Sequence, residues 1–367
     1  MTMSLAGIQA AITNRLPDVD TELVAGIIGD RPSQSAKSPS IWNPTFASLE
    51  LPVVYLPFDV DAAGLERLVD ALRASPHFIG GNVTMPHKVA VLPLLDEVDE
   101  RARAIGAVNT IVRTADGRLA GYNTDGKGGV DALSQAPAGQ ADARPLVPDL
   151  GGRKVLVMGA GGAGRALAVY LGEAIGPAGA LHIANRTVAQ ADAVVEAVNR
   201  RSSNCRRVDE IAPAQYDLVV NASTVGQAGV RSLPDGRVTC LEPFSPLAAA
   251  EAPAMDGSEA ADGAHFARRW MSRAAGAVGR NNAASLEALT ETPETVACYD
   301  VIFAPLETTF LRQARQTGHR TLNGRAMSVA QAADGFFNRV CRDLLDRRGL
   351  WRPDVYDRIV NTMSSVW

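Results

Sequence analysis

The stretch KVLVMGAGGAGRALAVYL, residues 154–171, decides the fold class of this chain. Its first five residues form an apolar run that predicts a buried strand, and residues 163–171 predict a helix. Between the two lies a glycine-rich loop, 159–164. Further strands are predicted over 181–186 and 218–221. The order strand, glycine turn, helix and strand is typical of one half of a Rossmann fold.

The glycine loop predicts a site for a dinucleotide cofactor. Missing side chains let the backbone approach a pyrophosphate, and the N-terminus of the following helix favours its negative charge. A purely structural glycine turn is the alternative. The predicted cofactor-binding residues of the loop are Gly159, Ala160, Gly161, Gly162, Ala163 and Gly164.

The residues that follow the next strand discriminate between NAD and NADP. An acidic side chain there would bond the ribose hydroxyls of NAD and repel a 2′-phosphate. This chain has Asn185, Arg186 and Thr187 instead. Because an arginine can pair with a phosphate and stack on adenine, the sequence favours NADP, with NAD tolerated. The alternative is that Arg186 is a solvated surface residue.

Strand and helix patterns also alternate before the glycine loop. Apolar runs over 24–29, 52–58 and 80–84 predict strands, and 65–74 predicts an amphipathic helix. Such alternation indicates a mostly parallel sheet with crossover helices. We therefore expect a two-domain α/β protein.

The predicted domains are a substrate-binding domain over 1–130 and a Rossmann domain over 131–325. An exposed linker is predicted at 135–150. An Ala-, Gly- and Pro-rich insertion at about 228–295 contains one predicted helix, 265–278. A surface excursion is the favoured interpretation of the insertion, and a lid is the alternative.

Three short turn-like motifs in the first domain carry proton-transfer groups. Lys88 ends the run NVTMPHK, Asn109 lies in GAVNT, and Asp125 lies in GYNTDG. In a cleft, a neighbouring carboxylate would hold the lysine in place for acid–base work. A surface lysine and ordinary turn-forming Asn and Asp residues are the alternatives.

Composition excludes several other classes of function. The chain has 367 residues and a formal net charge of −4, so no general basic field recruits nucleic acid or an anionic membrane. No apolar run approaches the roughly 20 residues that span a bilayer, and no secretory signal is evident. Four cysteines and five histidines are scattered without metal-ligand spacing, so we expect a metal-free, cytoplasmic protein.

Taken together, these motifs resemble those of the shikimate/quinate dehydrogenases over nearly the whole chain. The matching segments are 29–43, 82–88, 106–110, 123–126, 159–164, 185–187, 221–223, 300–309 and 324–331.

The resemblance implies reversible hydride transfer between NADP and a ring hydroxyl or ketone of shikimate, quinate or a close relative. The substrate is then a cyclic polyol acid, held in the first domain, and a C-terminal helix over 326–367 returns to that domain. Lys88 and Asp125 are implied as the catalytic pair. The implied substrate-binding residues are Ser38, Thr84, Asn109, Asp125 and Gln331, and Ser223, Val301 and Gly324 line the nicotinamide side. A monomer and a homodimer both agree with the sequence.

Three positions depart from the family pattern. Ala36 stands where the family has the first of two serines, Trp42 replaces a histidine, and Phe303 replaces a tyrosine. The first serine and the tyrosine help bind the substrate carboxylate in the family, so two donors are missing unless Ser35 or Lys37 substitutes. Each hydrogen bond to a charged group is worth about 1.5–3 kcal/mol.

These departures keep other functions open. One alternative is a dehydrogenase of the same fold for an amino-substituted or otherwise modified cyclic polyol. A non-enzymatic metabolite sensor and a Rossmann enzyme of another class, such as a folate dehydrogenase, are less favoured, because the proton-transfer residues are intact.

Overall fold

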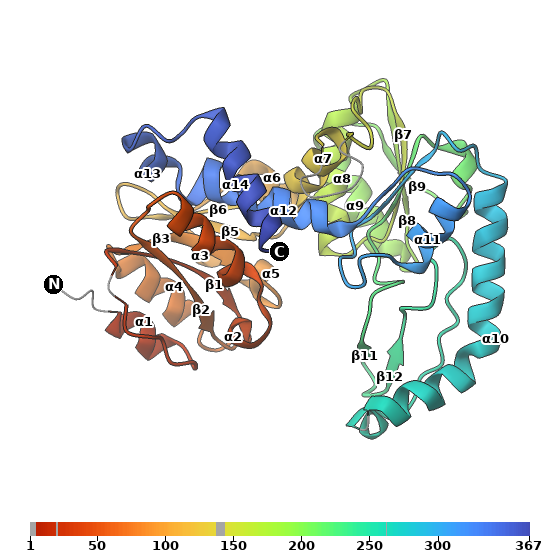
Figure 1. Ribbon diagram of the computed structural model, residues 1–367, viewed down its shortest axis with the longest axis horizontal. Coiled ribbons are helices and arrows are strands. Elements are labelled where there is room, and N and C mark those ends of the chain that lie inside the picture. The colour runs from red at the N-terminus through yellow and green to blue at the C-terminus, as the bar shows by residue number, and fades with distance from the viewer. Residues whose placement is uncertain (1–4, 20, 137–143, 262) are drawn as a thin grey trace. The chain divides into compact units, whose positions relative to one another are not determined.

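The computed structural model describes residues 5–19, 21–136, 144–261 and 263–367, which form two compact units (Figure 1). The first unit comprises the residues up to Asp131 together with Val329–Trp367, and the second comprises Ala132–Ala136 and Arg144–Ser328. Residues 137–143 of the linker predicted over 135–150 lie outside the described residues. None of the described helices is long and apolar enough to cross a membrane.

The first unit alternates strands with helices, as its sequence predicts. Its elements up to the boundary are α1 (Ala6–Ala11), β1 (Leu23–Gly29), α2 (Pro32–Ser35), α3 (Ser38–Ser48), β2 (Val53–Asp59), α4 (Leu65–Ala74), β3 (Phe78–Val83), α5 (His87–Ala90), η1 (Leu92–Leu94), β4 (Glu97–Val98), α6 (Glu100–Ile105), β5 (Thr110–Arg113), β6 (Leu119–Tyr122) and α7 (Asp125–Ser134).

The sheet of the first unit is mixed. Its strand order is β2-β1-β3-β5-β6-β4. β1 pairs in parallel with β2 and β3, whereas β5 runs antiparallel to both β3 and β6. This antiparallel pair was not expected from the sequence, where the segments 106–110 and 121–126 were interpreted only as turns.

Helices cover both faces of this sheet, and β1 contributes to a core on each face. Val24 and Ile28 belong to the core that includes α1 and α4, while Ala25 and Ile27 belong to the core that includes α3 and α14. Successive side chains of a strand point to opposite faces, so a strand buried on both faces is apolar throughout.

The expected C-terminal helix over 326–367 is not continuous, and this prediction was wrong in detail. The segment consists of α12 (Gly324–Asp334), a π-helical turn η4 (Gly335–Val340), α13 (Arg342–Arg347) and α14 (Pro353–Ser365). The break after α13 has a local cause, because Gly349 adopts a positive φ of 66° and Pro353 begins the next helix.

The second unit contains a parallel sheet of order β14-β13-β10-β7-β8-β9. Its elements are β7 (Lys154–Met158), α8 (Gly162–Ile175), β8 (Ala180–Ala184), α9 (Val188–Asn199), β9 (Cys205–Arg207), η2 (Pro213–Gln215), β10 (Leu218–Asn221), β13 (Ala297–Asp300), α11 (Thr309–Gln316) and β14 (Thr321–Leu322). β7, the glycine loop and α8 therefore follow one another in the order that the sequence predicts.

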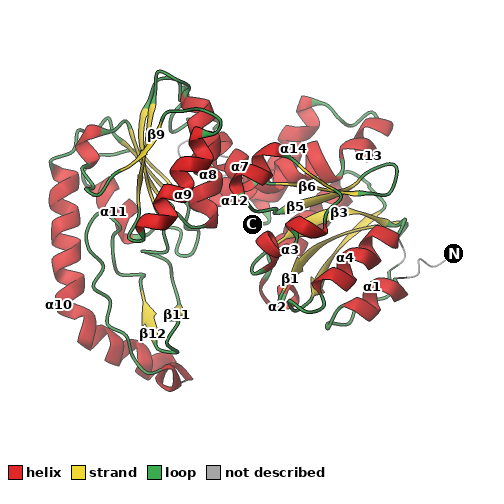
Figure 2. Cartoon of the chain, turned by 180° about the vertical axis from the view of Figure 1, so that it is seen from behind, coloured by secondary structure: helices red, strands yellow, loops and turns green. Residues whose placement is uncertain are grey.

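The insertion of the second unit folds around a core of its own. It contains the hairpin β11 (Val230–Ser232) and β12 (Val238–Cys240), the turn η3 (Gly257–Ala261) and the long helix α10 (Gly263–Thr290), all seen in Figure 2. Phe266, Trp270 and Ala274 of α10 pack against Phe244 and Val238. The helix is twice as long as the predicted 265–278, because its second half packs on α11 through polar contacts that hydrophobic spacing does not reveal.

Candidate active site

Lys88 and Asp125 form an ion pair in the first unit. Lys88 lies in the short helix α5, directly after β3, and Asp125 is the first residue of α7, after β6. Lys88 Nζ lies 2.7 Å from Asp125 Oδ2, and the two side chains are 29% and 17% exposed. The helix N-terminus favours a negative charge at Asp125. The structure therefore places an ammonium and a carboxylate in contact, both accessible to a ligand.

Asn109 holds the other oxygen of that carboxylate. Its Nδ2 donates to Asp125 Oδ1 at 2.8 Å, and its own Oδ1 accepts hydrogen bonds from the Thr124 amide at 2.8 Å and the Thr110 hydroxyl at 3.0 Å. These partners fix which end of the amide is the donor. Asn109 is almost fully buried, so its hydrogen bond holds the Asp125 carboxylate in a fixed orientation.

Gln331 reaches the same cluster from α12. Its Oε1 accepts a hydrogen bond from the Thr124 hydroxyl at 3.2 Å and lies 3.5 Å from Asn109 Nδ2. This approach depends on Gly128 of α7, because a Cβ atom built there would lie only 2.5 Å from the backbone N of Gln331. A glycine at position 128 thus permits the contact that brings Gln331 to the site.

Ser38 is connected to this cluster through residues that sequence reasoning missed. Ser38 forms a hydrogen bond with the Tyr55 hydroxyl, which donates to Asn82 Oδ1 at 2.6 Å. Asn82 Nδ2 in turn lies 3.4 Å from the Thr110 hydroxyl, the partner of Asn109. Burial raises the pKa of Tyr55 well above its usual value, so the hydroxyl stays a neutral donor. A buried tyrosine needs such a partner, and this is the signal in the sequence that could have identified Tyr55.

Thr84 lies at the end of β3, half-buried, with its backbone N bonded to Ile28 O at 2.9 Å. Its methyl group lies against Gly29, where an added Cβ would approach Cγ2 to 2.6 Å. Among the described residues, its hydroxyl makes no hydrogen bond to the Lys88–Asp125 cluster.

The positions that depart from the family pattern have other contacts. Trp42 is buried and packs against Tyr55 and Phe336, with ring centroids 4.8 and 5.1 Å apart, so it contributes to the core. Lys37 Nζ lies 4.0 Å above the ring of Trp367, and the Ser35 hydroxyl donates to Arg31 O at 3.4 Å. Lys37 and Ser35, the two residues that could replace the missing donors to the substrate carboxylate, thus already contact other residues of this chain.

The glycine loop of the second unit leaves room beside its backbone. A Cβ atom at Gly164 would lie 2.2 Å from Gly159 O, and one at Gly159 would lie 2.5 Å from Ser223 N, so both positions require glycine. At Gly161 and Gly162, by contrast, no atom lies within 4 Å of an added Cβ. The loop is therefore packed tightly on its inner side and open at the N-terminus of α8, the arrangement that a pyrophosphate requires.

The segment after β8 borders this loop. Asn185 Oδ1 accepts a hydrogen bond from Ala160 N at 3.1 Å, and Asn185 Nδ2 donates to Thr187 O at 2.9 Å. Arg186 is exposed. Asn185 thus ties the loop to the strand end, while the guanidinium of Arg186 remains available for an anionic ligand.

A buried carboxylate organises the remaining cofactor-side candidates. Asp300, at the end of β13, accepts hydrogen bonds from Asn221 Nδ2 at 3.1 Å and from the Thr308 hydroxyl at 2.7 Å. Asn221 Oδ1 accepts a hydrogen bond from the Ser223 hydroxyl at 2.7 Å. Burial raises the pKa of Asp300 to about 6, although these hydrogen bonds and that from the Ile302 amide oppose the rise. The candidate Ser223 is thus held by a chain of bonds that begins at Asp300.

Val301 and Gly324 lie together in the second unit. Val301 N donates to Asn221 O at 2.9 Å, and a Cβ atom at Gly324 would lie 2.0 Å from Val301 O. Phe303 follows with 44% of its surface exposed. No group of three or more His, Cys, Asp or Glu side chains placed to hold a metal ion is found within the described residues.

Comparison with known proteins gives one family. Residues 27–111 match the shikimate dehydrogenase substrate binding domain, and residues 141–231 match the shikimate / quinate 5-dehydrogenase domain. A shikimate dehydrogenase (NADP(+)) of Geobacillus kaustophilus is 35% identical over 317 residues, which cover 86% of this chain and 91% of the relative.

Solved structures agree with this result. The shikimate 5-dehydrogenase of Thermus thermophilus, in complex with NADP(H) and shikimate, is 26% identical with a TM-score of 0.64, over 94% of this chain and 100% of the other. The quinate dehydrogenase of Corynebacterium glutamicum, in complex with NAD, is 26% identical with a TM-score of 0.66, over 94% and 99%. The similarity thus extends over both units.

Proposed function

The chain belongs to the shikimate dehydrogenase family, and we propose from this premise that it interconverts shikimate and 3-dehydroshikimate with NADP. The observation that carries the proposal is the contact of 2.7 Å between Lys88 Nζ and Asp125 Oδ2. When bound, the nicotinamide accepts or supplies the hydride at its C4, so the protein has to supply only orientation and proton transfer.

We assign the proton transfer to Lys88. During oxidation a ring hydroxyl loses its proton while its carbon loses a hydride. Lys88 Nζ, in its neutral amine form, receives that proton from the reacting oxygen and becomes the ammonium. Asp125 keeps the lysine in place, and its own position is set by Asn109. In the reverse direction, Lys88 returns the proton to the forming alkoxide.

The ring hydroxyls would be held by the polar groups around this pair. Asn109, Asp125 and Gln331 are joined to one another by hydrogen bonds, and Thr84 and Ser38 complete the proposed set. Gln331 is half-buried, and its side-chain amide is the part of it that we assign to the ring hydroxyls.

The cofactor would be held by the second unit. The open backbone of the loop, Gly159 to Gly164, suits the pyrophosphate, and Arg186 suits the 2′-phosphate of NADP. Ser223, Val301 and Gly324 are assigned to the nicotinamide side. Asn185 and Thr187 complete the set at the adenosine end.

A second candidate function rests on the departures at Ala36 and Phe303. Neither side chain can donate a hydrogen bond to a carboxylate, and Lys37 lies over Trp367. A modified cyclic polyol without that carboxylate, or with an amino substituent, is therefore the alternative substrate.

A cytoplasmic location also belongs to the proposed function, because the four cysteines are free. The assembly is a monomer or a homodimer.

A panel assay separates the two candidates. Reduction of NADP⁺ and NAD⁺ is followed with shikimate, quinate and amino-substituted analogues at millimolar concentrations. We expect turnover with shikimate and NADP⁺. Turnover of another polyol, with none for shikimate or quinate, would favour the alternative substrate, and silence with the whole panel would contradict both.

A further inference from the structure

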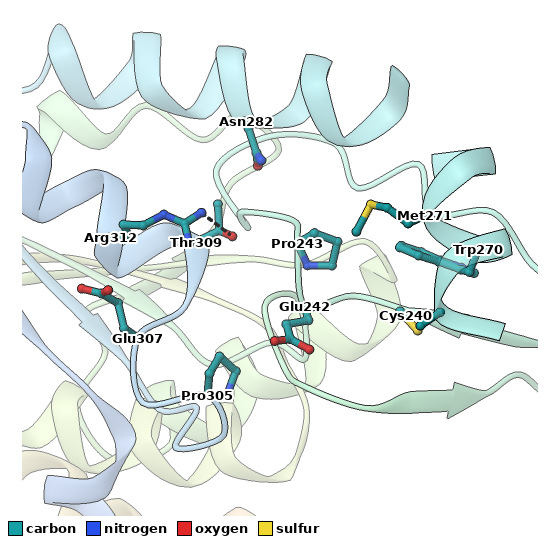
Figure 3. A pocket seen from close by; sticks show the side chains of 11 residues that line it. Cys240, Glu242, Pro243, Trp270, Met271, Asn282, Pro305, Glu307, Thr309 and Arg312 are labelled. Atoms are coloured by element: carbon teal, nitrogen blue, oxygen red, sulfur yellow. Dashed lines mark hydrogen bonds between the residues drawn. The ribbon is translucent and has the colours of Figure 1, made fainter. Parts of the chain in front are cut away.

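A pocket lies in the second unit, between the insertion and the segment from Pro305 to Arg312, and none of its lining residues is among those assigned to the cofactor. Its volume is about 440 Å³, within the range of sites for small molecules. The walls come from the end of β12 and the segment after it, from both halves of α10, from the segment after β13 and from α11 (Figure 3).

One side of this pocket is apolar. Trp270 and Met271 of α10 face Pro243, and Figure 3 shows the two side chains next to each other. Trp270 is buried and belongs to the core of the insertion, whereas Met271 is 44% exposed. An aromatic ring flanked by an exposed methionine forms an adaptable surface for an apolar group.

The opposite side carries a guanidinium. Arg312 lies at the start of α11, and its Nη2 donates to the Thr309 hydroxyl at 3.3 Å. Among the described residues Arg312 forms no ion pair, whereas the neighbouring Glu307 is already paired with Arg315 at 2.5 Å. The guanidinium is therefore available for a carboxylate, which it can bind through two hydrogen bonds.

Hydrogen-bond acceptors lie between these two sides. Asn282 Oδ1 is buried and has no hydrogen-bond partner within the described part of the chain, and its side chain points towards the pocket in Figure 3. Glu242 is exposed in the same pocket and forms no ion pair with a described residue. A buried acceptor without a donor is unfavourable, so a ligand with an N–H group would be favoured on this side of the pocket.

We propose that this pocket binds a free α-amino acid with an aromatic or large aliphatic side chain. The carboxylate pairs with Arg312, the ammonium pairs with Glu242 on the side of Asn282, and the side chain packs on Met271 and Pro243. Each of the three parts of such a ligand thus meets a group of matching chemistry.

The same pocket is connected to the cofactor side. Two of its lining residues, Glu307 and Thr309, flank Thr308, whose hydroxyl donates to Asp300. Asp300 holds Asn221, and Asn221 holds Ser223. Occupation of the pocket therefore alters NADP affinity, and binding of NADP alters amino-acid affinity by the same factor. This second part rests on the proposed function.

Calorimetry on the full chain tests the site itself. We expect L-phenylalanine and L-leucine to bind. Phenethylamine, which lacks the carboxylate, and 3-phenylpropionate, which lacks the amine, should bind at least about tenfold more weakly. Arg312→Gln should weaken binding by a similar factor, and Ala267→Trp, at an exposed position that lines the pocket, should abolish it. Arg268→Gln, on the exposed surface of the same helix, is the matched control and should change nothing.

Absence of binding by both amino acids at millimolar concentrations would overturn the proposal, as would binding that neither pocket variant weakens. The coupling has its own readout, the Kd of NADP⁺ with and without saturating L-phenylalanine, for which we expect a change of about fivefold or more. An unchanged Kd would refute the coupling and leave the site intact. Failure of NADP⁺ to bind under any condition would contradict the proposed function instead.

Discussion

Lys88 Nζ lies 2.7 Å from Asp125 Oδ2, although 37 positions of the chain separate the two residues. The pair is partly exposed, and ion pairs of this kind contribute only about 0–1 kcal/mol to stability. A buried asparagine nevertheless fixes the second carboxylate oxygen. Such precise support of a partly exposed pair indicates a role in chemistry more than in folding.

Substitution of Gly128 by alanine tests whether close helix contact positions Gln331. The new Cβ would lie 2.5 Å from a backbone atom, so we expect a loss of about 1–3 kcal/mol in the free energy of unfolding and a raised KM for the ring substrate. Urea denaturation and steady-state kinetics measure the two effects. Gly279→Ala, in an open position of α10, is the control and should stabilise by about 0.5–1 kcal/mol. If the two variants change the free energy of unfolding and the KM alike, the close contact at Gly128 does not position Gln331.

Restoring the two absent donors tests the interpretation of the carboxylate site. We expect the double variant Ala36→Ser with Phe303→Tyr to lower the KM for shikimate, because each new hydrogen bond to a charged group contributes about 1.5–3 kcal/mol. The kcat should change little, since Lys88 and Asp125 are untouched. A KM equal to that of the wild type would show that this chain does not bind the carboxylate at these positions.

Arg186→Leu tests the cofactor preference. Loss of one charge-assisted hydrogen bond to the 2′-phosphate should raise the KM for NADP⁺ by about tenfold or more. NAD⁺ lacks that phosphate and serves as the internal control, with kinetics that we expect to be unchanged. If both cofactors are affected equally, Arg186 does not read the phosphate.

The pH dependence of stability should reveal His182 of β8. Burial, together with the positive charges of Arg206 and Lys154, lowers the pKa of this side chain to about 4. Arg206 Nε donates to His182 Nε2 at 2.7 Å, so the folded protein holds a neutral ring. The unfolded chain takes up a proton near pH 6.5, and folding is therefore disfavoured progressively as the pH falls from about 6.5 to about 4.

Comparison with His182→Asn isolates this contribution. Asp300 acts in the opposite sense, because its pKa is raised to about 6 and its stabilising effect is lost as the pH rises through that value. Both proteins retain Asp300, so the difference between their unfolding curves reports the histidine alone. We expect the wild type to lose more stability than the variant between pH 6.5 and 4. Parallel curves would contradict the assignment.

Regular elements with strong local patterns were predicted from the sequence almost to the residue. β7, β10 and α4 have the predicted bounds. The antiparallel pair β5–β6 was missed because each strand has only four residues and lies beside a turn-forming asparagine, Asn109 before β5 and Asn123 after β6. The π-helical turn after α12 was missed because hydrophobic spacing continues through it. A Cβ atom added at Gly335 of this turn would lie within 4 Å of the side chains of Thr110, Thr124 and Asn82.

The residues of the candidate site were likewise only partly predicted from the sequence. Lys88, Asn109, Asp125 and Gln331 were selected from motifs, and the structure joins them by hydrogen bonds. Tyr55 and Asn82 were not selected as site residues, because Tyr55 was interpreted only as part of an apolar strand and Asn82 only as the first residue of the NVTMPHK run. Only the fold shows that the Tyr55 hydroxyl of β2 reaches Asn82 Oδ1 of β3 across the strand β1 that separates them.

Removal of the lysine tests the central claim most directly. NADP⁺ reduction by shikimate is measured for the wild type and for Lys88→Ala, with Lys127→Ala as the control, because Lys127 forms an ion pair with Asp131 on α7 outside the assigned site. We expect Lys88→Ala to lower kcat by about 10²–10⁴ and Lys127→Ala to leave it unchanged. A near-normal kcat for Lys88→Ala would contradict the role of Lys88 in proton transfer.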